Sequence, residues 1–304
     1  MKVLVTGGAG FIGSHIVDLL VEQSYDVIVV DNLSTGYITN LPPNVTFYEA
    51  DIRTNKIGDI FKQEKPDYVI HQAAQVDVSK SVLDPLTDAE NNVLGTVRLL
   101  SCCIKHSVKK IIYASSCAVY GETNDCSINE SFPIKPLSYY GLSKYIPEVY
   151  IKLFHDLHGL PYTILRYANV YGPRQSPKGE GGVVSIFFNK LISGESPTIY
   201  GNGEQTRDFV FVKDVARANV LSLHNGSNEI LNISRNEKIS INQLYRIISS
   251  IARNSPTPTY RDQRKGEILY SRLDNSKAKN VLGWNPSFDL FKGLTESYDF
   301  YLTN

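Results

Sequence analysis

The sequence has 304 residues, of which 42% are hydrophobic and 20% are charged, and its 31 basic residues are balanced by 31 acidic ones. This composition is typical of a soluble globular protein that is long enough for one large domain or two modest ones. Because the formal net charge is zero and no basic stripe stands out, the sequence excludes binding to nucleic acid or to an anionic membrane by bulk charge.

Targeting and membrane signals are not expected. No stretch approaches the ~18 apolar residues of a membrane span, and residues 2–6 are typical of a buried strand rather than of a signal peptide. The four cysteines form no C-x-x-C pair and have no histidine at zinc spacing; they are Cys102, Cys103, Cys117 and Cys126. We therefore expect reduced thiols, no metal site and a cytoplasmic location.

Short apolar runs alternate with amphipathic stretches through the first half of the chain. The predicted strands are Lys2–Thr6, Asp26–Asp31, Val45–Ala50, Asp67–His71, Lys110–Ser115 and Tyr162–Tyr167. The predicted helices lie near Phe11–Glu22, Asn55–Glu64, Pro85–His106 and Ser138–His158. This alternation predicts an α/β fold of the Rossmann type, a doubly wound parallel sheet with ligands at the carboxyl ends of its strands.

The pattern changes after Asn169. Residues 171–182 are rich in glycine and proline, and shorter elements follow. We expect a dinucleotide-binding domain over residues 1–168 and a smaller substrate-binding domain over residues 169–304. A strand near Glu229–Ser234 is expected to return to the first domain.

A glycine-rich turn follows the first strand and opens the first helix. Gly7, Gly10 and Gly13 stand in the spacing G-x-x-G-x-x-G. Glycine permits the tight turn and lets a pyrophosphate approach the backbone, while the helix N-terminus supplies free N–H groups. The context of strand, turn and helix predicts a dinucleotide site.

Asp31 ends the second predicted strand and points to the identity of the dinucleotide. A carboxylate at this place can accept both hydroxyls of the adenosine ribose and would repel a 2′-phosphate. No lysine or arginine occurs from residue 3 to residue 52. The sequence therefore predicts NAD rather than NADP.

Tyr140 and Lys144 form a Tyr-x-x-x-Lys pattern in the predicted helix 138–158. Residues four apart share one helix face, so the ammonium can favour the phenolate form of a tyrosine whose free pKa is near ~10. The strand that ends at Ser115 and Ser116 brings hydroxyls to the same edge, where a serine can hydrogen-bond a substrate hydroxyl. Each pattern alone is as typical of packing or of a turn cap, but their combination favours a catalytic site.

Together these residues resemble the extended short-chain dehydrogenase/reductase superfamily, in the NAD-dependent epimerase/dehydratase branch that includes UDP-glucose 4-epimerases. The resemblance covers essentially the whole chain. The matching segments include TGGAGFIGSH (6–15), VDNLSTG (30–36), NNVLGT (91–96), SSCAVYGE (115–122), PLSYYGLSKYIPE (136–148), RYANVYGPRQ (166–175) and YGNGEQTRDFVFVKDVA (200–216).

The resemblance implies a role for each matching residue. Tyr140 would be the catalytic base, Lys144 would tune it and hold the nicotinamide ribose, and Ser116 would bind the sugar 4-hydroxyl. Asp51 and Ile52 would contact adenine. The cofactor would also be bound by Gly7, Gly10, Phe11, Ile12, Asp31, Asn32, Ser34, Thr35, Gly36, Gln72, Ala73, Ala74, Gln75, Asn91 and Tyr167. The nucleotide sugar would be held by Asn169, Gly182, Val183, Val184, Tyr200, Arg207, Arg264 and Ser271.

The implied reaction is 4-epimerisation of a UDP-hexose through a transient 4-keto sugar. Close alternatives are another nucleotide-sugar epimerase, a 4,6-dehydratase or a decarboxylase. Related dehydratases carry an acidic pair directly after the serine or threonine, where this chain has Cys117 and Ala118. An NAD-binding sensor or scaffold without catalysis is a further alternative, but such proteins typically lack the tyrosine or the lysine. The resemblance also implies a homodimer formed through helices near 85–106 and 138–158.

Ser271 bears on the choice of sugar. In related epimerases, a position near the C-terminal pocket limits bulk at C2, and alignment places Ser271 there. A small residue should admit an N-acetyl group, so UDP-GlcNAc and UDP-GalNAc are expected as substrates beside UDP-glucose and UDP-galactose.

Overall fold

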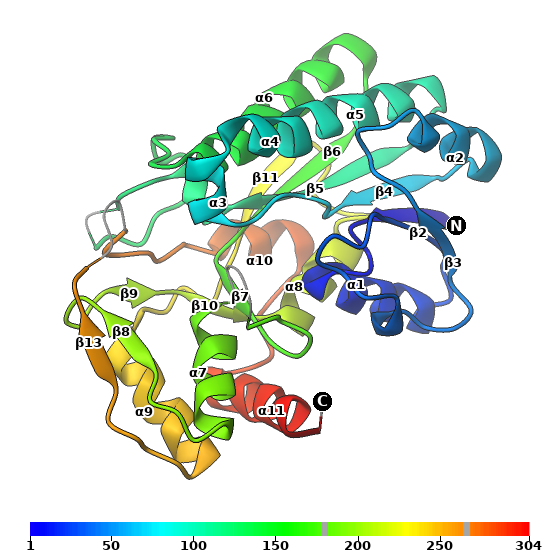
Figure 1. The fold of residues 1–304 in the computed structure, drawn as a ribbon. Helices are drawn as coiled ribbons and strands as arrows, with labels where there is room; N and C mark the ends of the chain where they lie inside the picture. Colours follow the sequence, from blue (N-terminus) through cyan, green and yellow to red (C-terminus); the bar gives the residue numbers. More distant parts are fainter. Residues whose placement is uncertain (124, 178–181, 264–267, 304) are drawn as a thin grey trace.

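The computed structural model describes residues 1–123, 125–177, 182–263 and 268–303. Its centre is a seven-stranded parallel sheet with the order β11-β6-β5-β4-β1-β2-β3 (Figure 1). The strands are β1 (Lys2–Thr6), β2 (Asp26–Asp31), β3 (Thr46–Glu49), β4 (Tyr68–His71), β5 (Lys110–Ser116), β6 (Tyr162–Tyr167) and β11 (Glu229–Ile233). The predicted doubly wound fold is confirmed.

Helices cover both faces of this sheet (Figure 1). One face carries α1 (Phe11–Glu22) and α8 (Val212–Leu221), and the other carries α2 (Lys56–Glu64), α5 (Gly95–Lys105) and α6 (Tyr139–His158). Side chains alternate between faces along each strand. Val3 and Val5 therefore join the core with α1 and α8, and Leu4 joins the core with α2 and α5. This two-sided burial explains why the strands are continuous apolar runs.

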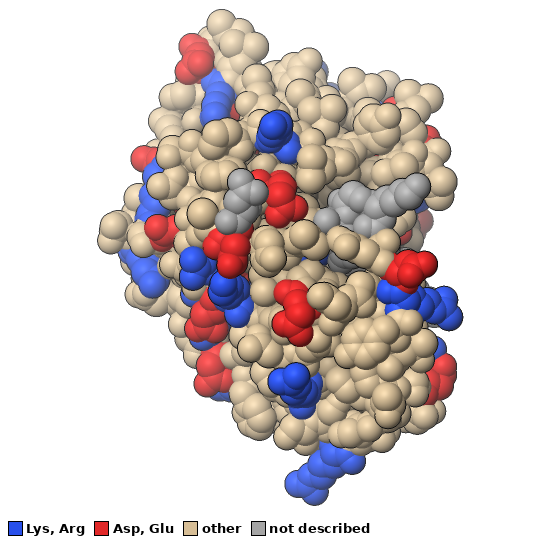
Figure 2. Space-filling model, turned by 90° about the vertical axis from the view of Figure 1, so that its left-hand side faces the viewer, with Lys and Arg blue, Asp and Glu red and all other residues tan. Residues whose placement is uncertain are grey.

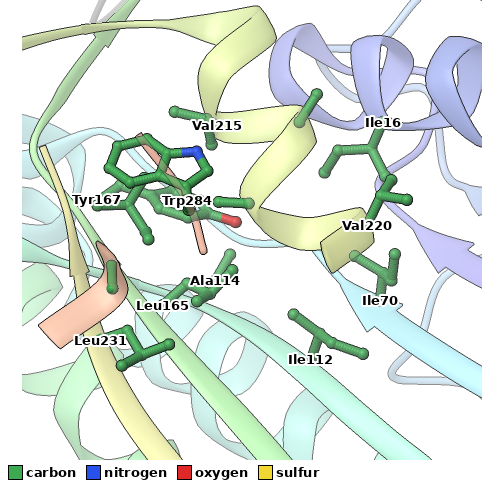
Figure 3. Close-up of a cluster of buried hydrophobic side chains, with 14 of the residues drawn as sticks. Ile16, Ile70, Ile112, Ala114, Leu165, Tyr167, Val215, Val220, Leu231 and Trp284 are labelled. Atoms are coloured by element: carbon green, nitrogen blue, oxygen red, sulfur yellow. The ribbon is translucent and has the colours of Figure 1, made fainter. Parts of the chain in front are cut away.

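The core beneath α1 and α8 joins segments that are far apart in the sequence. Figure 3 shows Ile16 of α1 and Val220 of α8 facing the side chains of the central strands, while Trp284 lies near Val215, toward the other end of α8. Trp284 is fully buried, and its Nε1 donates a hydrogen bond to the carbonyl oxygen of Asp214 at 2.8 Å. A residue near the C-terminus thus completes the core of the N-terminal sheet.

The order of the strands reverses between β1 and β4. The chain runs from β1 outward to β2 and β3, then crosses back to place β4 on the other side of β1. Ligands of open α/β sheets bind in the crevice outside the carboxyl ends of the strands at such a point. Here these ends carry the glycine-rich turn after β1 and residues Gln72 and Ala73 after β4.

The predicted helix 85–106 is wrong in its detail. It is divided into α4 (Pro85–Ala89), the π-helical turn η2 (Glu90–Leu94) and α5, and a short helix, α3 (Val78–Leu83), precedes it. Asp84 caps α4, because its carboxylate accepts a hydrogen bond from the backbone of Thr87 at 3.0 Å. A π-turn holds an extra residue and changes which side chain faces inward. As a result Asn92 is buried in η2.

The second half of the chain has a separate core, formed around Phe187, Phe188 and Leu244. Its helices are α7 (Val183–Ile192), α9 (Ile241–Ala252) and α11 (Leu290–Thr303), and α10 (Ser276–Leu282) lies beside β11. Its paired strands are β7 (Asn169–Tyr171) with β10 (Phe209–Phe211), β8 (Thr198–Tyr200) with β13 (Thr259–Arg261), and β9 (Thr206–Arg207) with β12 (Ile239–Ser240). Among the described residues, no helix is both long and apolar enough to span a bilayer.

Candidate active site

The glycine-rich turn lies tightly against the loop after β4. Gly7 has a φ of +68°, and a Cβ atom there would lie 2.6 Å from the backbone nitrogen of Ala73. A Cβ atom on Gly13 would collide with the carbonyl oxygen of Gly7. Helix α1 starts at Phe11 with Gly10 as its N-cap, and no side chain caps it. The turn therefore offers backbone N–H groups at close range, which fits the pyrophosphate of a dinucleotide.

Asp31 is buried at the end of β2, on the same side of the crevice. Its Oδ2 accepts a hydrogen bond from the backbone of Ala9 at 3.0 Å, and its Oδ1 accepts one from Leu33 at 2.8 Å. Burial raises the pKa of this carboxyl, and the backbone donors oppose that effect. Each carboxylate oxygen keeps a further acceptor site, so the group can also accept ribose hydroxyls.

Arg53 is the first lysine or arginine after the stretch 3–52 that has none, and it forms an ion pair with Asp51. Its Nη2 lies 2.8 Å from Asp51 Oδ2, and this guanidinium lowers the pKa of Asp51 to about 2. Asn32 Nδ2 donates to the same oxygen at 3.2 Å. The positive charge of Arg53 is thus already matched by a carboxylate, in keeping with a site for NAD rather than NADP.

Gly141 lets the predicted catalytic segments approach one another. A Cβ atom at Gly141 would lie 2.7 Å from the carbonyl oxygen of Ala118, which belongs to the turn η3 (Cys117–Val119) directly after Ser116. Ser138 caps α6 by accepting a hydrogen bond from Gly141 at 3.0 Å. The N-terminal turn of α6, which carries Tyr140, therefore packs against the turn that follows Ser116.

Lys144 is buried one helical turn after Tyr140, with 4% of its surface exposed. Its Nζ lies 4.9 Å from the ring centroid of Tyr113, and the Tyr113 hydroxyl donates to the carbonyl oxygen of Lys144 at 3.2 Å. Burial lowers the pKa of Lys144 to about 8, and the carboxylates of Asp88 and Glu148 act in the opposite direction. A protonated ammonium beside Tyr140 would favour its phenolate form.

The residues predicted to line the rest of the cofactor cleft make ordered contacts. Gln72 Nε2 donates to the Tyr167 hydroxyl and to Asn219 Oδ1, each at 3.1 Å. Gln75 binds the side chain of Asp88. Asn91 donates to the carbonyl oxygen of Thr87, within its own helical segment.

Sequence reasoning missed the neighbouring Asn92. Its Nδ2 donates to the carbonyl oxygen of Gln75 at 2.9 Å and to Ser143 Oγ at 2.9 Å, which joins the loop after β4 to α6. Two adjacent asparagines carry no signal in the sequence that shows which of them faces inward. The π-turn η2 determines that Asn92 is the asparagine that faces inward.

The other predicted cofactor residues lie in the loops after β2, β3 and β4 and at the start of α1. A Cβ atom on Gly36 would lie 2.8 Å from the carbonyl carbon of Ala9, so this loop touches the glycine-rich turn. Ile52 is buried and approaches Gly95 of α5. Ser34, Thr35, Ile12 and Ala74 lie in the same loops or at the start of α1.

Polar atoms without partners mark the side of the site formed by the second half. Asn169 Oδ1, Gln175 Oε1, Thr206 Oγ1 and Arg272 Nε are buried and have no hydrogen-bond partner among the described residues. Buried polar groups are normally satisfied. Their clustering in segments predicted to hold the nucleotide sugar fits a polar ligand or ordered water there.

Cys117 connects Ser116 to the second half. Burial raises the pKa of the Cys117 thiol, while hydrogen bonds with Ser271 and Ser116 and the charge of Arg207 lower it. Ser271 is 6% exposed. The structure thus brings Ser116, Ser271 and Arg207 together around one thiol.

The remaining predicted substrate residues lie in three places. Gly182 is the N-cap of α7, with Val183 and Val184 in its first turn and no side-chain cap. Tyr200 lies on β8, beside β13. Arg264 lies outside the described residues.

Among the described residues on the face drawn in Figure 2, charges of both signs are mixed. Figure 2 shows basic side chains (lysine and arginine) and acidic side chains (aspartate and glutamate) scattered between uncharged residues. Within the part of the chain that the structure describes, no three His, Cys, Asp or Glu side chains are placed to hold a metal ion.

Comparisons with known proteins agree with this geometry. The model of the NAD-dependent epimerase/dehydratase family matches residues 3–234. A putative UDP-glucose 4-epimerase of Methanocaldococcus jannaschii is 50% identical over 293 residues, which cover 96% of this chain and 95% of that protein.

Solved structures match over the full length. The crystal structure of a UDP-glucose 4-epimerase from Thermotoga maritima with UDP-glucose has a TM-score of 0.98 and 45% identity, covering 100% of this chain and 99% of that one. A UDP-N-acetylglucosamine 4-epimerase from Methanobrevibacter ruminantium, in complex with UDP-N-acetylmuramic acid, has a TM-score of 0.95 and 39% identity, covering 99% and 98%.

Proposed function

The chain belongs to the NAD-dependent epimerase/dehydratase family, and on this premise we propose that it interconverts the two 4-epimers of a UDP-hexose through a transient 4-keto sugar. The observation that carries the proposal is the close packing of α6, which bears Tyr140 and Lys144, on the turn that follows Ser116 at the carboxyl end of β5. NAD, when bound, supplies the acceptance and return of a hydride at C4.

Proton transfer, orientation of the sugar and binding of the diphosphate are assigned to side chains and backbone groups of this chain. Tyr140 takes the proton of the 4-hydroxyl as a phenolate and returns it after the keto sugar has turned. Lys144 holds Tyr140 in the phenolate form and binds the nicotinamide ribose. Ser116 orients the 4-hydroxyl through a hydrogen bond. Arg207, Asn169 and the first turn of α7 hold the diphosphate while the sugar turns, because guanidinium and backbone N–H groups match phosphate oxygens.

The position after Ser116 favours epimerisation over 4,6-dehydration. Dehydration needs acid–base groups for C5 and C6, and a carboxylate at that position would supply them. Here the position is Cys117, whose pKa is raised by burial, followed by Ala118. Neither side chain fits that role.

Substrate breadth is proposed from Ser271. Its small side chain is buried against Cys117, the neighbour of Ser116, and a larger residue at this position would take up space beside the proposed site of the sugar. UDP-GlcNAc and UDP-GalNAc are therefore proposed as substrates beside UDP-glucose and UDP-galactose. The match to an N-acetylglucosamine epimerase supports this proposal.

A homodimer is proposed from the outer face of α3 to α6. Exposed apolar side chains gather there although these helices already cover the sheet with their inner faces. They include Leu83, Leu86, Leu94, Leu142, Val149, Leu153 and Leu157. A second copy of this chain would bury them, and α6 would then be supported from outside. We also propose a cytoplasmic location, because all four cysteines are free thiols.

The test is to incubate the purified protein with UDP-galactose and, separately, with UDP-GalNAc, without added cofactor, and to resolve the epimers by NMR. Conversion to the gluco epimers is expected, with NAD carried by the protein. If UDP-galactose is not converted even with added NAD, the proposed reaction is wrong. If only UDP-galactose is converted, the reaction stands and the Ser271 argument fails.

A further inference from the structure

Asp88 is a buried carboxylate for which the reaction described above has no role. It lies in α4 with 1% of its surface exposed. Its Oδ1 accepts hydrogen bonds from Gln75 Nε2 at 2.8 Å and from Asn92 Nδ2 at 3.3 Å. Its Oδ2 is also buried and has no hydrogen-bond partner among the described residues. A buried carboxylate oxygen without a donor is costly, so a nearby cation is expected to compensate for it.

Lys144 of α6 is the cation on which Asp88 acts electrostatically. Asn92 Nδ2 donates both to Asp88 and to Ser143 Oγ, and Ser143 precedes Lys144 on α6. Helices α4 and α6 pack directly on each other. Lys144 is itself buried and forms none of the salt bridges found among the described residues.

The other groups around Lys144 are neutral or already paired. Glu148, one turn further along α6, is bound by Arg166 at 2.6 Å. Tyr113 offers its ring from β5, and Tyr140 is the group to be tuned. His71 of β4 is held neutral, because burial and the nearby Lys144 lower its pKa to about 3.

We propose that Asp88 is the positioning residue for Lys144: its unshared carboxylate oxygen provides the counter-charge that keeps the buried ammonium protonated and held near Tyr140. The Gln75 and Asn92 amides fix the carboxylate, so the loop that follows β4 and the helix that carries the base are tied to one point. This inference rests on the proposed function only for the role of Tyr140.

Electrostatics gives the direction of the effect. Burial alone disfavours the charged form of Lys144, and Asp88 is the largest influence that opposes it. Without that carboxylate, the ammonium loses its proton at a lower pH. Tyr140 then loses its neighbouring cation in the range where the enzyme works.

The Asp88→Asn variant separates charge from shape, because the asparagine oxygen can still accept from Gln75 and Asn92. The readout is the titration of the Lys144 side chain, followed by NMR on isotope-labelled lysine, with Lys144→Arg identifying the signal. Asp88→Asn should lower the pKa of Lys144 by about one unit, a tenfold change in its protonation equilibrium. Asp214→Asn is the matched control, since Asp214 is equally buried but lies in α8 and binds Ser287 and Phe288. The Asp214→Asn variant should leave the pKa of Lys144 unchanged.

Activity gives a second readout. In Asp88→Asn the alkaline limb of the kcat profile should move to lower pH, with KM for the UDP-sugar little changed. A loss of kcat that is equal at every pH, or an unmoved Lys144 titration, would overturn the inference. If the wild-type protein converts no UDP-sugar, the proposed function fails while the NMR titration still tests Asp88.

A double variant tests the proposal if the single variant does not fold stably. If Asp88→Asn alone is unstable because the buried charge of Lys144 loses its counter-charge, then adding Lys144→Met should restore stability against urea. Two changes whose effects on stability add independently would contradict electrostatic coupling between Asp88 and Lys144.

Discussion

Arg166 and Glu148 form a buried ion pair directly behind the catalytic segments. Nε and Nη2 of Arg166 donate to the two carboxylate oxygens of Glu148 at 2.9 and 2.6 Å, and the side chains are 2% and 0% exposed. Ser115, the neighbour of Ser116, donates to the same carboxylate. The pair therefore joins α6, β5 and β6 at the point where the catalytic side chains emerge.

Removal of one partner of this pair should be costly. In Glu148→Gln the guanidinium of Arg166 stays buried without its counter-charge, and we expect a loss of about 3–5 kcal/mol in the free energy of unfolding. Urea denaturation measures this loss. The exposed pair of Lys190 with Glu195 is the control, and Lys190→Ala should cost less than about 1 kcal/mol. Equal costs for the two variants would refute the structural role given to Glu148.

Tyr140→Phe should abolish most of the turnover without disturbing the cofactor. Loss of a positioned general base costs about 10²- to 10⁴-fold in kcat, while the phenyl ring keeps the packing. The bound NAD per protein chain and the melting temperature should match those of the wild type. Tyr139→Phe, next to it on the exposed side of α6, should retain normal activity. A near-normal kcat of Tyr140→Phe would show that Tyr140 is not the general base.

Ser271→Tyr should narrow the substrate range. A ring at this buried position fills the space proposed for an N-acetyl group, so turnover of UDP-GalNAc should fall at least about tenfold relative to UDP-galactose, which corresponds to about 1.4 kcal/mol. The ratio of the two kcat/KM values measures it, and Ser271→Ala serves as the small-residue control. A uniform loss on both substrates would indicate overpacking and not selection.

Two buried histidines should make the fold sensitive to acid. Burial lowers the pKa of His15 to about 4 and that of His71 to about 3, against about 6.5 for a free histidine. Below pH 6.5 these histidines bind protons in the unfolded chain but stay neutral in the folded one. The free energy of unfolding therefore falls as the pH falls from 6.5 toward the folded pKa values. Each histidine contributes about 1.4 kcal/mol per pH unit until its folded pKa is reached.

Unfolding free energies between pH 7 and pH 5 test this prediction. His15 Nε2 contacts the carbonyl oxygen of Pro173, and His15→Gln removes its titration. The variant should show a shallower decline with acid than the wild type. Parallel curves would show that His15 binds protons as readily in the folded protein as in the unfolded one.

Leu153→Lys should dissociate the proposed dimer. Leu153 is 48% exposed on α6, and a lysine from each copy would place charge in the middle of an apolar contact. Sedimentation analysis should give the monomer mass for this variant and the dimer mass for the wild type. Leu302→Lys, on α11 and similarly exposed, should remain dimeric. A monomeric wild-type protein would refute the proposed homodimer.

Local patterns in the sequence were enough to predict most of the Rossmann half. The ranges predicted for the runs Lys2–Thr6 and Tyr162–Tyr167 agree with the observed strands, because fully buried strands and a glycine-rich turn have strong local signals. The Tyr-x-x-x-Lys pattern likewise needed only helical spacing to place Lys144 one turn from Tyr140.

Features that depend on packing between segments were not predictable. An aspartate on a helix, such as Asp88, is expected at the surface, and only the contact of α4 with α6 buries it. The π-turn that directs Asn92 inward has no marker that separates it from an ordinary helix. The contact between Cys117 and Ser271 joins residues that are distant in sequence, and only the resemblance, not a local pattern, pointed to Ser271.

The late strand β11 has a consequence for protein engineering. It pairs with β6 through Leu231 and Leu165, and α8 before it packs on α1. A chimera that exchanged everything after residue 168 for the corresponding part of a relative would also replace one strand and one helix of the nucleotide-binding layer. A graft that omitted them would leave β6 as an open edge, which invites other chains to add to the sheet. Substrate-binding segments can thus be exchanged only if α8, β11 and the segment from α10 to Trp284 are retained, because all three contribute to the core of the N-terminal sheet.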